Sequence, residues 1–420
     1  MELTKEIQEF LHNDALERFL RYVKIWTTSD ETKESVLTTE IQLDLGRVLV
    51  EELKELRIDG VIQDEFGFVY ANLPPSKGFE KAKPIGLLAH IDTSPAVSGR
   101  NVKPVIHKNY DGKKIKFAQD KDLILNFDDS PKLSEYIGLD IITTEGDTLL
   151  GADDKAGIAE IMVACAAWKK FPELKHGPIY ICFSPDEETG LGMTKVNKKN
   201  LPDICYTVDG GEMGELEYEC FDAWRAIFKF KGLNVHSGYA KNKMINSIKV
   251  ASMFFSDIPE SESPEYTEKR EGFFHLTKMQ GSPEETTARM IIRDFNLEKN
   301  KRRMNYINTL KNVYEIRFPG LKIDIKFTHQ YQNMLKFIEK KPSIIDLAKQ
   351  AIEKAGLEPI IQPIRGGTDG SRLSAEGILT PNIFAGGLLF HSRKEHIPTL
   401  ALQKAAEVLI HLADLWANEK

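Results

Sequence analysis

The sequence contains few cysteines, no long apolar run and no excess of basic residues. Its four cysteines lie far apart and form no C-x-x-C pair: Cys165, Cys182, Cys205 and Cys220. Because each lies in or beside apolar sequence, we expect buried free thiols and a reducing compartment. No window offers about 18 apolar residues for a membrane span, and the opening MELTKEIQEF is amphipathic, unlike a signal peptide. These absences predict a soluble, cytoplasmic protein.

The charge balance argues against a nucleic-acid partner. Lys and Arg number 56 and Asp and Glu 63, which leaves a formal net charge of −7, whereas nucleic-acid binding usually needs a basic patch. The one basic cluster, Lys299–Arg303, lies in a helical pattern, where a solvated helix face explains it. We therefore expect neither a nucleic-acid nor a membrane partner.

Length and periodicity predict two domains with an α/β sheet in the first. A chain of 420 residues, 41% hydrophobic and 28% charged, is too long for one ordinary core. Apolar residues at helical spacing predict helices over 5–27 and 40–56. Apolar runs predict buried strands at 84–95, 179–184 and 204–208. Each run ends in His or acidic residues, which predicts a site at the strand ends.

The pattern changes near Phe221, where strands and helices follow in the order β-α-β-β-α-β. This is the split βαβ order of a ferredoxin-like module. Because α/β character resumes afterwards, we expect a module inserted into the first domain. The predicted boundaries are 1–219 and 331–420 for the first domain, with a mixed central sheet flanked by helices, and 220–330 for the inserted α+β domain.

The stretch LLGADDKAGIAE places two adjacent carboxylates, Asp153 and Asp154, at a turn that follows Gly151 and opens a helix of small residues. A strand-to-helix turn directs side chains out of the fold, where they can bind a metal ion. Taken alone the stretch is ambiguous, since acidic turns are more often solvated or cap a helix.

Further His and acidic residues follow the other predicted strands. His90 and Asp92 share one side of a strand end, and a carboxylate beside a ligating imidazole fixes its tautomer. A buried, hydrogen-bonded histidine is the simpler alternative for His90 alone. The pair Glu187–Glu188 follows the next strand and could direct one acid at a metal and one at a water. A solvated pair at a helix N-terminus is the alternative.

Asp209 precedes Gly210-Gly211 and His391 lies in a late glycine-rich segment. Either residue alone could be an ordinary turn or surface residue. Together, however, two histidines and at least three carboxylates at separate strand ends predict a two-metal site. Imidazole with carboxylate suits Zn²⁺, with Mn²⁺ or Co²⁺ as substitutes, better than Ca²⁺ or Mg²⁺. A bridging carboxylate would hold two such ions about 3.5–4 Å apart.

Eight segments, in order, carry a resemblance to a known family: HIDT, LLGADDKAGIAEIM, PDEETG, YTVDGGEMGELEYE, NVHSGYAK, ESPEYTEKREGF, IIRDF and PIRGGTDGSRLS. The chain resembles the peptidase T family of tripeptide aminopeptidases. These belong to the co-catalytic zinc peptidases, with carboxypeptidase G and succinyl-diaminopimelate desuccinylase. The resemblance extends from about residue 14 to 418. It implies a zinc-peptidase catalytic domain, an inserted lid domain and a short peptide substrate.

The resemblance also implies a ligand for each metal position. One zinc would be held by His90, Asp153 and Asp209. The second would be held by Glu188 and His391, with Asp153 bridging the two ions.

Two further roles and one backbone feature follow from the same resemblance. Asp92 would orient His90, and Glu187 would be the general base. Asp153 rather than Asp154 is the implied ligand, because in the family pattern the ligand lies two residues before the lysine, here Lys155. The Asp153–Asp154 peptide bond is expected to be cis.

The resemblance also implies substrate-binding residues, in the inserted domain and, at Arg365, in the second part of the first domain. His236 matches a substrate-contacting histidine, and Arg365 in PIRGG matches a clamp on the substrate's carboxylate. Arg293 is a second candidate for that clamp, with a structural salt bridge as its alternative. Two positions depart from the family pattern: Lys394 replaces a histidine, and NVHSG replaces NVHPG.

The resemblance leaves open the oligomeric state and the reaction within the wider family. We expect a monomer, or a homodimer formed through the lid domain. A related two-zinc carboxypeptidase or deacylase would use the same ligands, so only the pocket walls distinguish it from an aminopeptidase. A catalytically inactive binding homologue is the third alternative. It would have lost a ligand or the base, whereas here every such position is filled.

Overall fold

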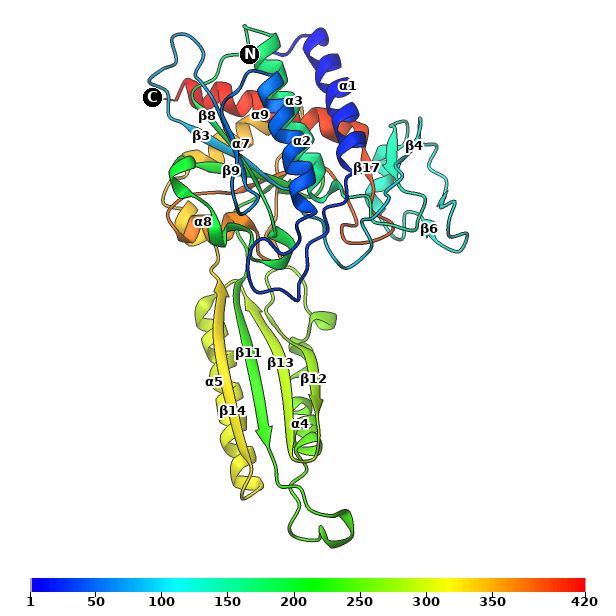
Figure 1. Ribbon diagram of the computed structural model, residues 1–420, viewed down its shortest axis with the longest axis vertical. Helices are drawn as coiled ribbons and strands as arrows, with labels where there is room; N and C mark the ends of the chain where they lie inside the picture. The colour runs from blue at the N-terminus through cyan, green and yellow to red at the C-terminus, as the bar shows by residue number, and fades with distance from the viewer. Residues whose placement is uncertain (1, 420) are drawn as a thin grey trace. The chain divides into compact units, whose positions relative to one another are not determined.

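The computed structural model describes residues 2–419, which form two compact units. Unit 2 consists of Glu219–Leu335 and Pro363–Gly367, and unit 1 contains the remaining described residues (Figure 1). The sequence placed Glu219, residues 331–335 and residues 363–367 in the first domain, whereas the structure places them in unit 2. The last strand of unit 2 extends to Tyr331, and Ile364 N donates to Glu219 O at 2.8 Å.

The eight-stranded sheet of unit 1 is mixed, as predicted. Its order is β1 (Asp59–Gln63), β2 (Val69–Leu73), β8 (Ile179–Ser184), β3 (Ile85–His90), β9 (Cys205–Gly210), β16 (Asn382–Phe384), β10 (Glu215–Glu217) and β15 (Ile360–Ile361). The central strands β8, β3, β9 and β16 run parallel to one another. The pairs β1–β2, β2–β8 and β10–β16 are antiparallel. The parallel strands are nearly all buried, because their sequences are continuous apolar runs.

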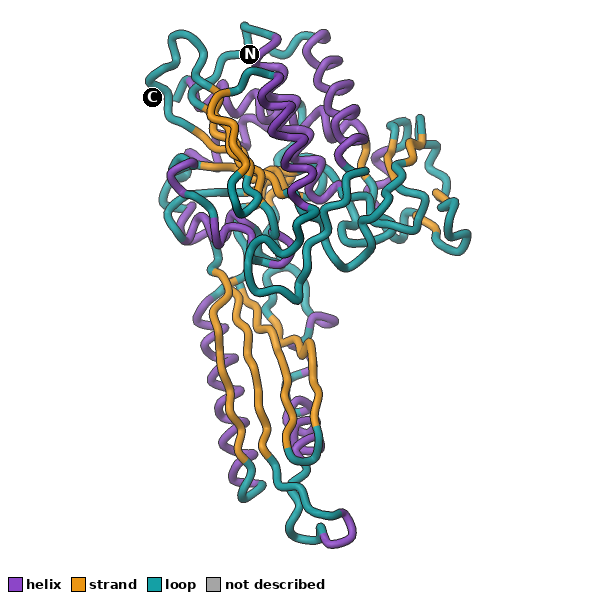
Figure 2. The backbone as a smooth tube through the Cα atoms, viewed as in Figure 1, coloured by secondary structure: helices purple, strands orange, loops and turns teal. Residues whose placement is uncertain are grey.

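Helices cover this sheet (Figure 2). They are α1 (Lys5–Tyr22), α2 (Gln42–Glu55), α3 (Ala152–Lys170), α7 (Ser343–Lys354), α8 (Asp369–Ala375) and α9 (Thr399–Ala417), with the short α6 (Leu335–Ile338) at the boundary of the units. The first helix ends at Tyr22, not at residue 27, because the following segment turns and Thr28 bridges to Thr93. Within residues 2–419 no helix is long and apolar enough to cross a membrane.

Helix α3 lies close to the sheet because its buried face is built of small residues. A Cβ atom at Gly157 would lie 1.9 Å from the Val208 carbonyl oxygen of β9, so only glycine permits this approach. The close packing places the first turn of α3 beside the carboxyl end of β9.

The segment between β3 and α3 contains several short strands. Strands β4 (Val105–His107), β7 (Ile141–Thr143) and β17 (Ile397–Pro398) form one small sheet, and β5 (Ile115–Lys116) and β6 (Ile124–Leu125) form another. These strands have two or three residues each, too short for a periodic pattern to be visible. Strand β17 attaches the stretch that follows His391 to this extension.

Unit 2 has the predicted β-α-β-β-α-β order: β11 (Asp222–Lys231), α4 (Ser247–Ser256), β12 (Phe273–Gly281), β13 (Glu285–Asp294), α5 (Leu297–Arg317) and β14 (Lys322–Tyr331). The sheet order β12-β13-β11-β14 is antiparallel throughout. Helices α4 and α5 cover one face (Figure 1). Alternation along β11 buries Ala226, Phe228 and Phe230 in the core of this unit.

Candidate metal centre

Three of the predicted site residues lie at the carboxyl ends of the parallel central strands in the sheet of unit 1. His90 is the last residue of β3, Asp209 lies at the end of β9, and Glu188 follows β8 in a short 3₁₀ helix, Glu187–Thr189. Strand β3 pairs in parallel with both β8 and β9, so their carboxyl ends meet at the same edge. Asp153 in the first turn of α3 and His391 in the loop after β16 complete the set.

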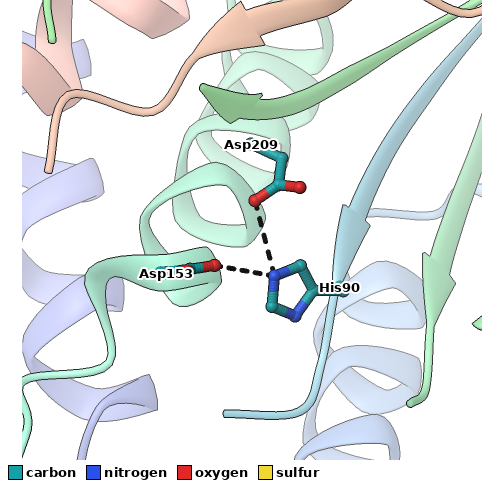
Figure 3. A group of neighbouring side chains, drawn as sticks. All are labelled: His90, Asp153 and Asp209. Atoms are coloured by element: carbon teal, nitrogen blue, oxygen red, sulfur yellow. Dashed lines mark hydrogen bonds and ion pairs between the residues drawn. The ribbon is translucent and has the colours of Figure 1, made fainter. Parts of the chain in front are cut away.

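We call His90, Asp153 and Asp209 the His90 group (Figure 3). His90 Nε2 lies 2.8 Å from Asp153 Oδ1 and 3.4 Å from Asp209 Oδ1. The other ring nitrogen, Nδ1, lies 3.0 Å from the Asp92 carbonyl oxygen and 3.3 Å from Asp92 Oδ1. A proton on Nδ1 therefore leaves the Nε2 lone pair directed at the two carboxylates, the tautomer that a metal ligand requires.

We call Asp153, Glu188 and His391 the His391 group. His391 Nε2 lies 2.9 Å from Asp153 Oδ2 and 2.9 Å from Glu188 Oε2. Within each group the potential ligand atoms lie within 4.8 Å of one another. Asp153 thus directs one carboxylate oxygen into each group, which is the arrangement of a bridging ligand.

The donor set and its charges fit divalent cations. Burial raises the pKa of Glu188 to about 7, with repulsion from Asp153 adding to it, and burial raises the pKa of Asp209 to about 6. Glu188 Oε1 is buried and has no hydrogen-bond partner among the described residues. A buried, unpaired carboxylate oxygen beside other carboxylates calls for positive charge. Imidazole nitrogens with carboxylate oxygens are the donors that zinc accepts.

Asp153 and Asp154 have different surroundings. The Asp154 carboxylate accepts hydrogen bonds from the backbone N–H groups of His90 (3.1 Å) and Gly157 (3.2 Å) and belongs to neither group. Only Asp153 faces both histidines. The Asp153–Asp154 peptide bond is cis, as the resemblance implied.

Asp92 contacts more than His90. Its buried carboxylate accepts hydrogen bonds from the backbone N–H groups of Glu187 (3.0 Å) and Glu188 (3.2 Å). One carboxylate therefore positions both the imidazole of His90 and the turn that carries the two glutamates. Glu187 is half-buried and is absent from both ligand groups; burial, with repulsion from Asp209, raises the pKa of its carboxyl group.

Sequence reasoning missed a second anchor of this turn, Asp186. It is buried, has a φ of +57°, and accepts hydrogen bonds from Thr38 N (2.8 Å), Thr38 Oγ1 and Gln42 Nε2 (2.7 Å). The Asp186 N–H donates in return to Gln42 Oε1 at 3.1 Å. The motif PDEE draws attention to Asp186, but nothing in one sequence pairs it with residues more than 140 positions earlier.

A second missed carboxylate, Asp369, lies at the start of α8. Ser184 Oγ, at the end of β8, donates a hydrogen bond of 2.6 Å to Asp369 Oδ2. Burial raises the pKa of Asp369 to about 7. The segment PIRGGTDG contains this residue, and the pattern directed attention to its arginine instead.

The three predicted substrate-binding residues lie in unit 2. His236 is exposed, and its Nδ1 accepts a hydrogen bond from Gly238 N at 3.2 Å. Arg293 is 9% exposed and donates to Trp224 O, Ile292 O and Gln330 Oε1.

Arg365, the third of them, donates to the carbonyl oxygens of Lys269 (2.7 Å), Glu271 (2.9 Å) and Thr267 (3.3 Å). Its guanidinium also lies over the ring of Phe221 at 5.2 Å. The expected alternative for Arg293 was a salt bridge; its partners are instead neutral oxygens. Both arginines thus have hydrogen-bond partners within unit 2.

Residues 144–415 match a family model described as Peptidase family M20/M25/M40. Peptidase T of Clostridium acetobutylicum is 47% identical over 408 residues, which cover 97% of this chain and 100% of that protein. Peptidase T of Desulfitobacterium hafniense strain Y51 is 47% identical over 410 residues, with coverage of 97% and 99%.

Two solved structures have a similar fold. Aminopeptidase PepT from Bacillus cereus matches with a TM-score of 0.76 and 20% identity, and a tripeptidase from Staphylococcus aureus with 0.77 and 21%. Each match covers 97% of this chain and 99% of the other chain. At this identity the two structures support the fold alone.

Proposed function

The chain belongs to peptidase family M20/M25/M40 and is a metallopeptidase, and from this premise we propose that it removes the N-terminal residue from tripeptides at a centre of two zinc ions. The observation that carries the proposal is the position of Asp153. Its two carboxylate oxygens lie 2.8 Å from His90 Nε2 and 2.9 Å from His391 Nε2. The tripeptide preference follows from the similarity to proteins named peptidase T.

The His90 group would hold one ion and the His391 group the other, with Asp153 common to both. Bound zinc ions would supply positive charge that polarises the scissile carbonyl and lowers the pKa of the attacking water. Mn²⁺ or Co²⁺ would suit the same nitrogen and oxygen donors. Asp92 holds the His90 ring in its ligating tautomer and keeps the glutamate turn beside it.

Glu187 is the proposed general base. As the water oxygen attacks the carbonyl carbon, Glu187 accepts one of the water protons. It then donates this proton to the amide nitrogen when the C–N bond breaks, so that the dipeptide leaves with a free amine. The hydrogen bond from Glu187 N–H to Asp92 fixes the backbone from which this carboxyl group projects.

Residues of unit 2 are the proposed contacts to the rest of the peptide. His236 would donate a hydrogen bond to the carbonyl oxygen as negative charge develops on it. Arg365 would bind the peptide's C-terminal carboxylate and release the carbonyl oxygens that it now contacts. Hydrogen bonds between two charged groups are stronger than those from a guanidinium to a neutral carbonyl oxygen. Arg293 is less suited to this role because its side chain is buried, whereas that of Arg365 is partly exposed.

A panel of di-, tri- and tetrapeptides with free or acetylated amino termini tests the proposal, with Zn²⁺, Mn²⁺ or Co²⁺ added to metal-free protein. We expect the fastest release of the N-terminal residue from unblocked tripeptides and none from acetylated ones. The Glu187→Gln variant, purified in parallel, controls for contaminating peptidases. Preferential cleavage of acetylated substrates would contradict the proposal and favour a deacylase or carboxypeptidase of the same family.

A further inference from the structure

Glu395, four residues after His391 on the same loop of unit 1, has its carboxylate buried against the turn that opens α3. The residue is 1% exposed. Its Oε2 accepts hydrogen bonds from Leu150 N (2.7 Å) and Gly151 N (2.9 Å), and its Oε1 accepts one from Asp153 N (3.2 Å). Three backbone donors are therefore satisfied by one carboxylate.

These hydrogen bonds join two segments about 240 positions apart in the chain. One carries Asp153, the carboxylate shared by both groups, and the other carries His391. Hydrogen bonds from N–H groups to a buried carboxylate are strong, because the acceptor is charged and water does not compete. Glu395 thus fixes the distance between the two loops that meet in the His391 group.

The other polar contacts of the His391 loop lie nearer the surface. Lys394 pairs with Asp129 at 2.5 Å and Arg393 with Asp120 at 2.8 Å, and in both pairs a quarter or more of each side chain is exposed. Exposed ion pairs contribute little to the position of a loop. Among these three consecutive residues, Glu395 is therefore the one whose contacts can set the geometry.

We propose that Glu395 is a positioning residue that controls metal affinity at the His391 group by holding Asp153 and His391 at ligating distance. The inference rests on the proposed two-ion centre. Removal of a group that orients metal ligands typically weakens metal binding by about 10- to 100-fold. The His90 group depends less on Glu395, because His90 and Asp209 are held by the strand ends of β3 and β9.

The Glu395→Gln substitution separates this role from packing. The amide has nearly the same volume as the carboxylate, but its NH₂ group must face at least one of the three N–H donors in either orientation. Glu395→Asp keeps the charge and shortens the side chain by one methylene. Glu407→Gln is a matched control, since Glu407 is also buried but pairs with Lys404 on α9 at 2.8 Å.

Zinc titration of the metal-free proteins by calorimetry, with dialysis at buffered free Zn²⁺, measures both dissociation constants. We expect two ions per chain in the wild type and in Glu407→Gln. In Glu395→Gln the dissociation constant of the weaker zinc site should rise about 10- to 100-fold. The dissociation constant of the tighter site should change less. Glu395→Asp should lie between the wild type and Glu395→Gln.

Two results would contradict different claims. Wild-type protein that binds no zinc would refute the proposed function itself. Wild-type protein that binds two ions, together with unchanged constants in both Glu395 variants, would refute only the role of Glu395. Should Glu395→Gln fail to fold, Glu395→Asp alone decides between these outcomes.

Discussion

The two ligand groups share Asp153 but are held in place by different means. In the His90 group, His90 and Asp209 end neighbouring parallel strands, and their side chains are 2% and 11% exposed. In the His391 group, Glu188 lies in a single turn of 3₁₀ helix and His391 in a loop, and the His391 side chain is 45% exposed with a φ of +58°. Backbone ladders position the first group, whereas side-chain anchors position the second.

The difference indicates where the centre is robust and where it is adjustable. The strand ends are fixed by backbone hydrogen bonds between neighbouring strands in the buried sheet of unit 1. The loops depend on a few carboxylates: Asp92 and Asp186 hold the glutamate turn, and Glu395 holds the turn of Asp153. We therefore expect substitutions of Asp186 or Glu395, and partial chelation, to affect the His391 group first.

The largest effect is expected from Asp153→Asn, because Asp153 belongs to both groups and its substitution should prevent metal binding at each. An amide has one oxygen and one NH₂ group, so the side chain can no longer direct an acceptor oxygen into each group. We expect loss of both ions in elemental analysis and no detectable hydrolysis. Asp257→Asn, which alters a carboxylate paired with Tyr314 in unit 2, is the control. Retention of two ions in Asp153→Asn would contradict a bridging role.

Glu187→Gln should separate metal binding from catalysis, because it removes the proposed base and leaves both groups intact. We expect kcat to fall by about 10²- to 10⁴-fold, the usual contribution of a general base. Elemental analysis should still find two ions per chain. A variant that loses its metal together with its activity would indicate that the roles of Glu187 and Glu188 are exchanged.

Asp186→Asn should weaken metal binding at the His391 group selectively. The new NH₂ group would face the donors of Thr38 and Gln42, so the turn that carries Glu188 loses its anchor. We expect about 10- to 100-fold weaker binding of one ion and little change in the other, measured by zinc titration. The control is Asp64→Asn, which disturbs a surface turn by weakening hydrogen bonds from Phe66 and Phe68. Equal weakening of both ions would contradict the distinction between strands and loops.

The smallest effect is expected from Arg365→Ala, which touches neither group. If Arg365 binds the peptide carboxylate, the variant should lose about tenfold in kcat/KM. Hydrogen bonds between charged groups contribute about 1.5–3 kcal/mol, and the loss of the present contacts of Arg365 offsets part of this gain. The loss should disappear with C-terminally amidated tripeptides. Arg289→Ala, an exposed arginine of β13, serves as the control. A wild type that treats acids and amides alike would rule out the clamp.

The sequence predicted the parts of the fold that depend on long, regular patterns. The apolar runs of β3, β8 and β9 identified the central strands, and the six-element order of unit 2 identified its antiparallel sheet. Strands of two or three residues, such as β5 and β17, lie below the length at which a period is visible. All five predicted ligands meet in the two groups, because each follows or opens a regular element at one sheet edge; their binding of metal stays a prediction.

The anchors escaped prediction for a different reason. Asp186, Gln42 and Glu395 are ordinary polar residues whose partners lie more than 140 positions away, and one sequence contains no signal of such pairing. The backbone oxygens that Arg365 contacts carry no side-chain signature at all. What sequence patterns identify is the chemistry of the ligands; what they omit is the set of contacts that positions them.

Anomalous diffraction at the zinc edge, from crystals grown with Zn²⁺, tests the central claim most directly. We predict two peaks about 3.5–4 Å apart on either side of Asp153, one contacted by His90 and Asp209 and one by Glu188 and His391. Brief soaking in a chelator should lower the occupancy of the peak beside His391 first. A single peak, or peaks that Asp153 does not bridge, would contradict the two-ion centre.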